Sequence, residues 1–227
     1  MNRRRESPVA LAIKISKLWG PHFPVNIRQI AQELSGKQSD PIVKIEGLDL
    51  QGAEGFLARG RGKGWGIAYS TYIREEGKVN FVIGHELGHY LCHRFDLLEG
   101  TLCTRTDILD FRTPGEDERN IEQEANAFAS YLLMPIADFR QQIAGHNISI
   151  ESLAACAARY DTTLSATALK LVDFTHEAVA VLLSSGGKIV WARSSTAAMR
   201  AGLYFRRGTV VPQRSITAKH SVLNIAA

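Results

Sequence analysis

The sequence predicts an α+β fold, in which a small antiparallel sheet is set among amphipathic helices. Helix start and stop signals recur along most of the chain, and three short β-prone runs stand together between two of the helical segments. The chain has 227 residues, of which 45% are hydrophobic and 22% are charged. Such a chain can bury the core of one medium domain, or of one domain with a small appendage, and the composition argues against disorder of the whole chain.

Two helices and three strands are predicted before residue 70. Ser7 followed by Pro8 is typical of a helix N-terminus and predicts the first helix. Asn26 and Gln29 have the spacing of a capping box, which predicts a second helix over 27–34. The strands are separated by glycine-rich or polar turns, which favours an antiparallel sheet, and they are Val43–Leu48, Gly55–Arg59 and Trp65–Tyr69.

The rest of the chain is predicted to be mainly helical and to end in a hairpin. The predicted helices are, in order, Val79–Phe95, a segment from the Thr113–Glu116 capping box to residue 134, Ile150–Arg159 and Ser165–Phe174. The last two resemble a helix-turn-helix pair. A Ser184–Gly187 turn between two β-prone runs predicts a β-hairpin. We expect three parts: a domain over 1–146, a helical segment over 147–175 and a tail over 176–227.

Several classes of protein are excluded. No run of about 18 apolar residues is present, so no membrane helix and no membrane partner are expected. The apolar stretch after the N-terminal arginines is broken by Lys14 and makes a poor signal peptide. Cys92, Cys103 and Cys156 have no C-x-x-C spacing, which argues against a disulfide framework and a thiolate zinc cluster. We therefore expect a cytoplasmic protein.

Residues 85–89 form the motif H-E-x-x-H, with His85, Glu86 and His89. On a helix, residues four apart share a face, so the two imidazoles can bind one zinc ion. Glu86 is rotated by one residue and can approach a zinc-bound water as a general base. The alternative is a helix that carries two surface histidines by chance. The apolar residues before the motif, with the costly glycines Gly84 and Gly88, favour a buried helix packed closely on another element.

The third zinc ligand is expected from the helix predicted over 114–134. Glu122 lies on the inward side of this helix, which is marked by an apolar stripe of Ile121, Ala125, Phe128 and Leu132. An inward carboxylate needs a counter-charge, which a metal ion supplies, so we expect Glu122 to be the ligand. Glu124 projects on the outward flank, and Glu118 lies in the first turn, where the helix dipole explains an acid.

Other polar residues near the motif have several interpretations. Asn126 either orients a ligating histidine through its other ring nitrogen or is an inert polar group. His93 lies about 12 Å from His85 along the helix axis, too far to share the ion, and is interpreted as a hydrogen-bonded histidine at the rim. The residue that stabilises the oxyanion is left open among Tyr90, His93, Tyr131 and His146.

These residues together resemble the ImmA/IrrE family of zinc metallopeptidases, which have a zincin-like fold. The resemblance rests on Phe81–His93 (FVIGHELGHYLCH) and Glu122–Pro135 (EQEANAFASYLLMP), and it covers roughly residues 8–173. It implies that His85, His89 and Glu122 are zinc ligands and that Glu86 is catalytic. Cys92 departs from the family pattern, which usually has an aliphatic residue there, and is interpreted as a small buried hydrophobe.

The resemblance also implies a function. Members of the family are cytoplasmic regulatory proteases that cleave helix-turn-helix transcriptional repressors, which derepresses genes of mobile elements or of stress responses. Longer members carry a helix-turn-helix-like middle and a GAF-like regulatory domain. Residues 178–227 resemble only the start of such a domain, so the tail is either part of a truncated domain or a remnant packed on the peptidase.

The distribution of charge bears on the partner. The net charge is +4 and the isoelectric point is about 9.0, which admits nucleic acid. The excess lies in residues 176–227, with seven basic residues and one acidic, whereas residues 1–175 have 20 basic and 22 acidic. The slightly acidic body suits a basic DNA-binding protein as substrate, and direct DNA binding is not expected because Ser165–Phe174 has only Lys170 as a cation. The alternatives are a DNA-binding regulator and a catalytically silent zinc protein that only grips its partner.

Overall fold

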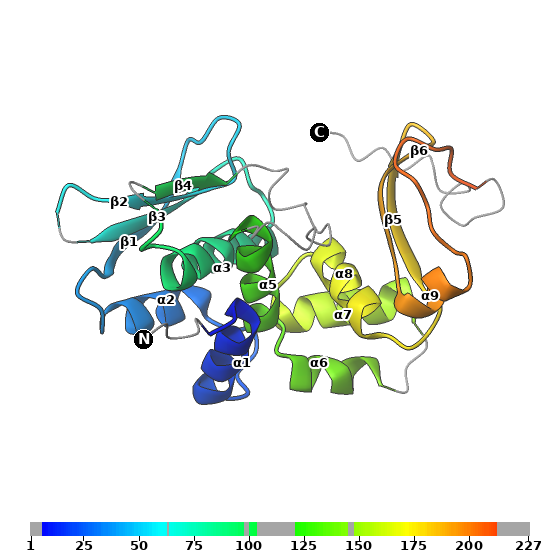
Figure 1. Cartoon of the computed structure of the whole chain (residues 1–227), viewed down its shortest axis with the longest axis horizontal. Coiled ribbons are helices and arrows are strands. Elements are labelled where there is room, and N and C mark those ends of the chain that lie inside the picture. The colour runs from blue at the N-terminus through cyan, green and yellow to red at the C-terminus, as the bar shows by residue number, and fades with distance from the viewer. Residues whose placement is uncertain (1–5, 63, 98–99, 104–120, 145–147, 213–227) are drawn as a thin grey trace. The chain divides into compact units, whose positions relative to one another are not determined.

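The computed structural model describes residues 6–62, 64–97, 100–103, 121–144 and 148–212 (Figure 1). The chain divides into two compact units, Met1–Leu164 and Ser165–Ala227. No helix in the described part is long and apolar enough to cross a membrane. The predicted capping box at Thr113–Glu116, Glu118 and His146 lie outside the described residues.

The N-terminal unit begins with two helices that start where the sequence predicts. Helix α1 spans Pro8–Trp19, and the Ser7 hydroxyl oxygen accepts a hydrogen bond from a backbone amide of its first turn. Helix α2 spans Ile27–Ser35, and Asn26 Oδ1 accepts from the Gln29 amide at 3.0 Å. The apolar faces of both helices lie in the core.

The sheet is mixed, which corrects the antiparallel sheet predicted from the sequence. Its described strands are β1 (Ile42–Leu48), β2 (Gly55–Arg59), β3 (Trp65–Ser70) and β4 (Gly100–Cys103), in the order β1-β3-β2-β4. β2 pairs antiparallel with β3 and β4, but β1 runs parallel to β3. β2 does not pair with β1. β3 therefore lies between β1 and β2, and its residues Trp65 and Ile67 are buried. The short strand β4 was not predicted.

Helices cover one face of this sheet (Figure 1). Helix α3 spans Glu76–Cys92 and packs against β2, β3 and α5, whose described residues are Ile121–Leu133. α3 begins earlier than predicted and ends before Phe95, because the backbone at His93 leaves the helical region (φ −123°, ψ −13°). The core of the unit lies between the sheet and the helices.

Two more helices complete the N-terminal unit. Helix α6 (Ile136–Ile143) was not predicted, because Pro135 was interpreted as a helix stop whereas it also precedes the next helix as its N-cap residue. Helix α7 (Ile150–Tyr160) begins at a capping box on Ser149. The Arg159 guanidinium donates two hydrogen bonds, of 2.8 and 2.9 Å, to the Asp138 carboxylate, which ties α7 to α6.

The C-terminal unit contains the predicted hairpin. Its elements are α8 (Leu164–Phe174, starting at the boundary), β5 (Ala180–Ser185), β6 (Lys188–Ser194) and α9 (Thr196–Arg200). β5 and β6 pair antiparallel, and Gly186 and Gly187 have positive φ angles of 55° and 73°, as a tight hairpin turn requires. The helix-turn-helix arrangement of α7 and α8 and the three-part division of the chain stay predictions.

Candidate metal centre

The residues of the H-E-x-x-H motif lie in the middle of α3, which is buried along most of its length. Phe81, Val82 and Ile83, which precede Gly84 and the motif, lie in the core. His85, Glu86 and His89 are each 0% exposed. Because polar side chains buried to this degree need partners, their contacts indicate what they can do.

Two glycines let α5 approach α3 closely, as the sequence predicts. A Cβ at Gly84 would lie 3.3 Å from the Ala129 Cβ, and one at Gly88 would lie 3.2 Å from the Ala125 Cα. Both contacts would be tighter than ordinary van der Waals contact, so larger residues would push the helices apart. The close approach brings the Glu122 end of α5 to the motif.

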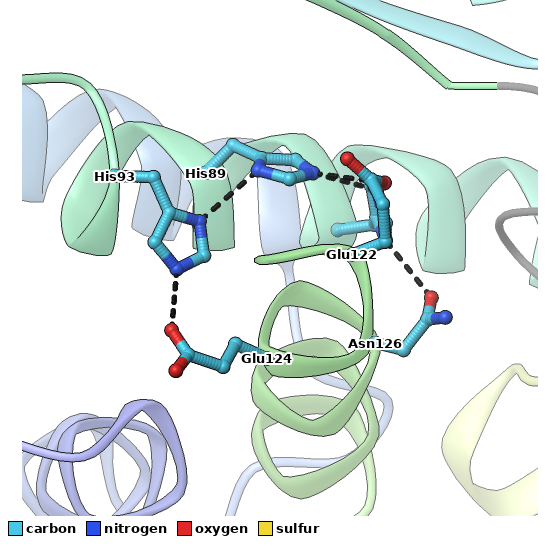
Figure 2. Close-up of polar contacts among 6 residues, drawn as sticks. His89, His93, Glu122, Glu124 and Asn126 are labelled. Atoms are coloured by element: carbon cyan, nitrogen blue, oxygen red, sulfur yellow. Dashed lines mark hydrogen bonds and ion pairs between the residues drawn. The ribbon is translucent and has the colours of Figure 1, made fainter. Parts of the chain in front are cut away.

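Three donor atoms from the two helices converge. The Nε2 atoms of His85 and His89 are 2.9 Å apart, and Glu122 Oε2 lies 3.1 Å from the first and 3.2 Å from the second. Figure 2 shows the side chains of His89 and Glu122 pointing toward one another. Glu122 thus lies on the side of α5 that faces the motif, where the helical wheel places it.

The protonation of the cluster fits a bound cation. Burial lowers the pKa of His89 from 6.5 to about 4, although its hydrogen bond to Glu122 acts in the opposite direction, so this ring is neutral at pH 7. Burial is the largest single influence on the pKa of Glu122 and acts to raise it, but the hydrogen-bond contacts and the charge interactions with His85 and His89 together outweigh burial and hold the pKa well below its usual range. Two imidazole nitrogens and a carboxylate oxygen within 4.8 Å of one another are a donor set that divalent zinc accepts. The three residues therefore fit a metal ion.

Glu86 lies beside this cluster in a different state. Both of its carboxyl oxygens are buried and have no hydrogen-bond partner among the described residues. Burial raises the pKa of Glu86 well above its usual range, and the negative charge of Glu122 raises it further. A carboxylate with a raised affinity for protons, next to a metal-binding donor set, has the properties of a general base.

Two residues that enclose Glu86 were missed by the sequence analysis. Gly55 begins β2 and pairs with Cys103 of β4. A Cβ at Gly55 would lie 2.6 Å from Glu86 Oε1, so the glycine leaves the room that the carboxylate occupies. The Cys103 sulfur lies within 4.8 Å of donor atoms of His85 and Glu86. A glycine in a predicted strand was a signal of close approach, but no signal pointed to Cys103.

The second ring nitrogens of the two histidines have different partners. His85 Nδ1 lies 2.9 Å from Asn126 Oδ1. His89 Nδ1 lies 3.1 Å from His93 Nδ1, and His93 Nε2 lies 2.8 Å from Glu124 Oε2 (Figure 2). Glu124 therefore reaches α3, whereas the wheel placed it on the outward flank of its helix. The wheel gives only the direction of Cβ, and a glutamate side chain is long enough to turn back.

The other sequence candidates lie at the edge of the site. The Tyr90 hydroxyl donates to the Asp40 carbonyl at 3.0 Å, so this group is already engaged by the loop before β1. Tyr131 and Cys92 are partly buried on α5 and α3. None of these contacts assigns the oxyanion-stabilising residue.

A comparison with protein families covers the same elements. The model for the IrrE N-terminal-like domain, peptidase family M78, matches residues 43–172, more than half of the chain. The matched segment includes α3, α5 and every residue of the cluster. A search of curated proteins finds no match. The chain therefore belongs to peptidase family M78, the family of the IrrE N-terminal-like domain.

Proposed function

We propose that this protein is a zinc-dependent endopeptidase, in which His85, His89 and Glu122 hold the zinc ion and Glu86 is the general base. The proposal rests on the convergence of two imidazole Nε2 atoms and one carboxylate oxygen, at 2.9 to 3.2 Å, beside a second carboxyl that is fully buried. Two histidines and one carboxylate are a ligand set of catalytic zinc sites. Membership of a peptidase family supports the same conclusion.

Each side chain then has a defined task. When bound, zinc supplies a Lewis acid that acidifies water and polarises a carbonyl oxygen. The raised pKa suits Glu86 to take a proton from the attacking water and to give it to the leaving amine of the cleaved peptide bond. Asn126 is proposed as a positioning residue, because its Oδ1 accepts the hydrogen from His85 Nδ1 and so leaves the Nε2 lone pair for the metal.

The proposed substrate is a DNA-binding repressor of the helix-turn-helix class, whose cleavage in the cytoplasm would derepress genes of a mobile element or a stress response. The family resemblance and the slightly acidic body, with 20 basic and 22 acidic residues over 1–175, support a basic protein substrate. In the described sheet β4 is an outer strand, and it ends at Cys103 near Glu86. An extended substrate segment that paired with β4 would therefore lie near the general base.

The environment of Lys170 argues against direct DNA binding by α8. Lys170 is the one cation of this helix, and it is 2% exposed. Burial lowers its pKa to about 7, while the charge of Asp173 acts in the opposite direction. Because phosphate binding depends on exposed lysines and arginines, α8 is poorly suited to dock into a DNA groove.

The proposal is tested by co-expression with the repressors encoded beside this gene, together with zinc analysis of the purified protein. We expect the wild type to contain zinc and to cleave a repressor. Glu86→Gln should keep the zinc and cleave at least about 100-fold more slowly, and Glu122→Ala should lose the zinc. Glu76→Gln is the matched control, because Glu76 lies on the same helix with a side chain that is 63% exposed.

Each outcome decides one part of the proposal. Cleavage by Glu86→Gln at the wild-type rate would contradict the assignment of Glu86 as the general base. Normal zinc content in Glu122→Ala would contradict the assignment of Glu122 as the third ligand. Repressor binding by the zinc-loaded wild type, without cleavage, would favour a catalytically silent zinc protein. A salt-dependent shift of duplex DNA by the purified protein would favour a DNA-binding regulator.

A further inference from the structure

His93 and Glu124 form a hydrogen-bonded pair behind the metal-binding cluster. His93 directly follows Cys92, the last residue of α3, and it is 1% exposed. Its Nδ1 lies 3.1 Å from His89 Nδ1, and its Nε2 lies 2.8 Å from Glu124 Oε2. Figure 2 shows the three side chains in series, from α3 across to α5. Neither His93 nor Glu124 has a task in the proposed peptidase mechanism.

The two contacts determine where the ring hydrogens lie. A neutral imidazole carries one hydrogen, so His89 can offer the Nε2 lone pair to a metal only if its hydrogen is on Nδ1. That hydrogen is then donated to His93 Nδ1, which must be unprotonated to accept it. The hydrogen of a neutral His93 ring is consequently on Nε2, where the Glu124 carboxylate accepts it. One direction of hydrogen bonding along the series therefore agrees with metal binding by His89.

We propose that His93 and Glu124 are positioning residues that hold His89 in its metal-binding tautomer and orientation. This inference rests on the proposed function, since it needs His89 to be a ligand. A carboxylate accepts but cannot donate, so Glu124 selects the His93 tautomer that carries hydrogen on Nε2. That tautomer can only accept at Nδ1, and it therefore selects the Nδ1–H tautomer of His89. Polar partners of the second ring nitrogen of a ligating histidine commonly contribute about 10- to 100-fold to metal affinity.

The two ligating histidines thus differ in how they are held. His85 has the amide oxygen of Asn126 behind it, whereas His89 has a second imidazole and then a carboxylate. His89 lies one helical turn closer to the end of α3 than His85, so its partner comes from the helix terminus as well as from α5. The longer series anchors the last turn of α3 to the Glu122 end of α5.

The first test is zinc affinity of the full chain, measured by competition with a chelator. His93→Phe keeps the ring volume but removes the acceptor, and we expect zinc to bind about 10- to 100-fold more weakly. His93→Asn places an amide oxygen near the position of Nδ1 and should bring the affinity back to within about threefold of wild type. Glu124→Leu should weaken binding by up to about tenfold in the wild type but have no further effect in His93→Asn. His22→Phe, at an exposed histidine, is the matched control.

The second test reads the tautomers by ¹⁵N NMR of the histidine rings in the zinc-loaded protein. We expect the His93 ring hydrogen on Nε2 in the wild type and partly on Nδ1 in Glu124→Leu, a change that a merely structural role would not produce. Hydrogen on His93 Nδ1 in the wild type, or wild-type zinc affinity in His93→Phe, would overturn the inference. If the wild type itself binds no zinc, or if His89→Ala binds it as well as wild type does, the proposed function fails instead.

Discussion

The two carboxyl groups nearest the paired histidines lie in opposite environments. Glu86 on α3 is fully buried, has no hydrogen-bond partner among the described residues, and has a raised pKa because of that burial. Glu122 on α5 has a side chain that is 22% exposed, and burial acts to raise its pKa as well. Its hydrogen-bond contacts with His85 and His89 and the charge interactions with the same two rings together outweigh burial and lower the pKa.

The difference comes from the two helices. α3 is enclosed by the sheet and by α5, so any carboxyl that points from it toward β2 is dehydrated. α5 brings the Glu122 carboxyl, which is partly exposed, to the Nε2 atoms of the two imidazoles. The two environments therefore suit the two proposed roles, a proton acceptor for Glu86 and a charged ligand for Glu122.

The largest effect is expected from crowding Glu86. Gly55→Ala introduces a Cβ that would lie 2.5 Å from the Val82 Cγ1 and 2.6 Å from Glu86 Oε1, so the carboxylate must move. We expect peptidase activity to fall by about 100-fold while zinc content stays normal, because a shift of about 1 Å at a catalytic group has that cost. Gly66→Ala in β3 is the control, since its Cβ would have nothing closer than 4.0 Å. Equal activity in both variants would show that Glu86 is not confined by β2.

A second expectation concerns the stability of the metal-free protein. When folding raises the pKa of a carboxyl, its contribution to stability is fully present below the unfolded pKa of about 4.5. The contribution is lost as the pH rises through the higher pKa of the folded state. Glu86→Gln removes that loss, so we expect it to stabilise the protein by about 2 kcal/mol at pH 7.5 and by little at pH 4. Urea unfolding at the two pH values, with a chelator present, measures the difference. A stability gain of the same size at both pH values would contradict the buried, titrating carboxyl.

The same substitution on α5 should have the opposite sign. The pKa of Glu122 is lowered by folding, so its contribution is present above the unfolded pKa of about 4.5 and is lost as the pH falls. Glu122→Gln should therefore destabilise the metal-free protein by about 1 kcal/mol at pH 7.5, because it removes the negative charge that the interactions with His85 and His89 favour. Urea unfolding under the same conditions provides the comparison, and stabilisation by both Glu→Gln variants would remove the contrast between the helices.

Much of this contrast follows from local sequence patterns. The H-E-x-x-H spacing places two imidazoles on one face of α3, and the apolar stripe of the second helix places Glu122 toward them. Glycine is costly inside a helix, so its presence at Gly84 and Gly88 indicates that a larger side chain would not fit there. The two glycines therefore predict the close approach of the helices. These features depend on helical periodicity, which the sequence shows directly.

Features that depend on tertiary pairing were not predictable in the same way. The parallel pairing of β1 with β3 depends on where the chain crosses the sheet, and β4 is only four residues long. The contacts of Gly55 and Cys103 with the site arise from strand neighbours that are about 50 residues apart in the chain. The contact of Glu124 with His93 depends on side-chain torsions, which a helical wheel does not contain.

The smallest effect is expected where the two helices touch. Gly88→Ala introduces a Cβ that would lie 3.1 Å from Phe128 Cδ1 and 3.2 Å from the Ala125 Cα, so α5 must give by a few tenths of an ångström. Alanine is favoured over glycine in a helix by about 1 kcal/mol, which offsets much of the strain, so the free energy of unfolding should change by less than about 1 kcal/mol. Glu122, the proposed third ligand, lies one turn before Ala125 on the displaced helix, so zinc affinity should fall by about three- to tenfold.

The control for this last effect is Gly84→Ala, whose Cβ would have no atom closer than 3.3 Å. This variant tests the same helix contact one turn farther from His89, and its zinc affinity should fall less than that of Gly88→Ala. Chelator competition on the two purified variants gives both affinities, and urea unfolding gives both stabilities. A loss of affinity in Gly88→Ala without a comparable loss of stability would show that the spacing of α3 and α5 serves the site more than the core. Unchanged affinity would show that Glu122 can follow the histidines when its helix moves.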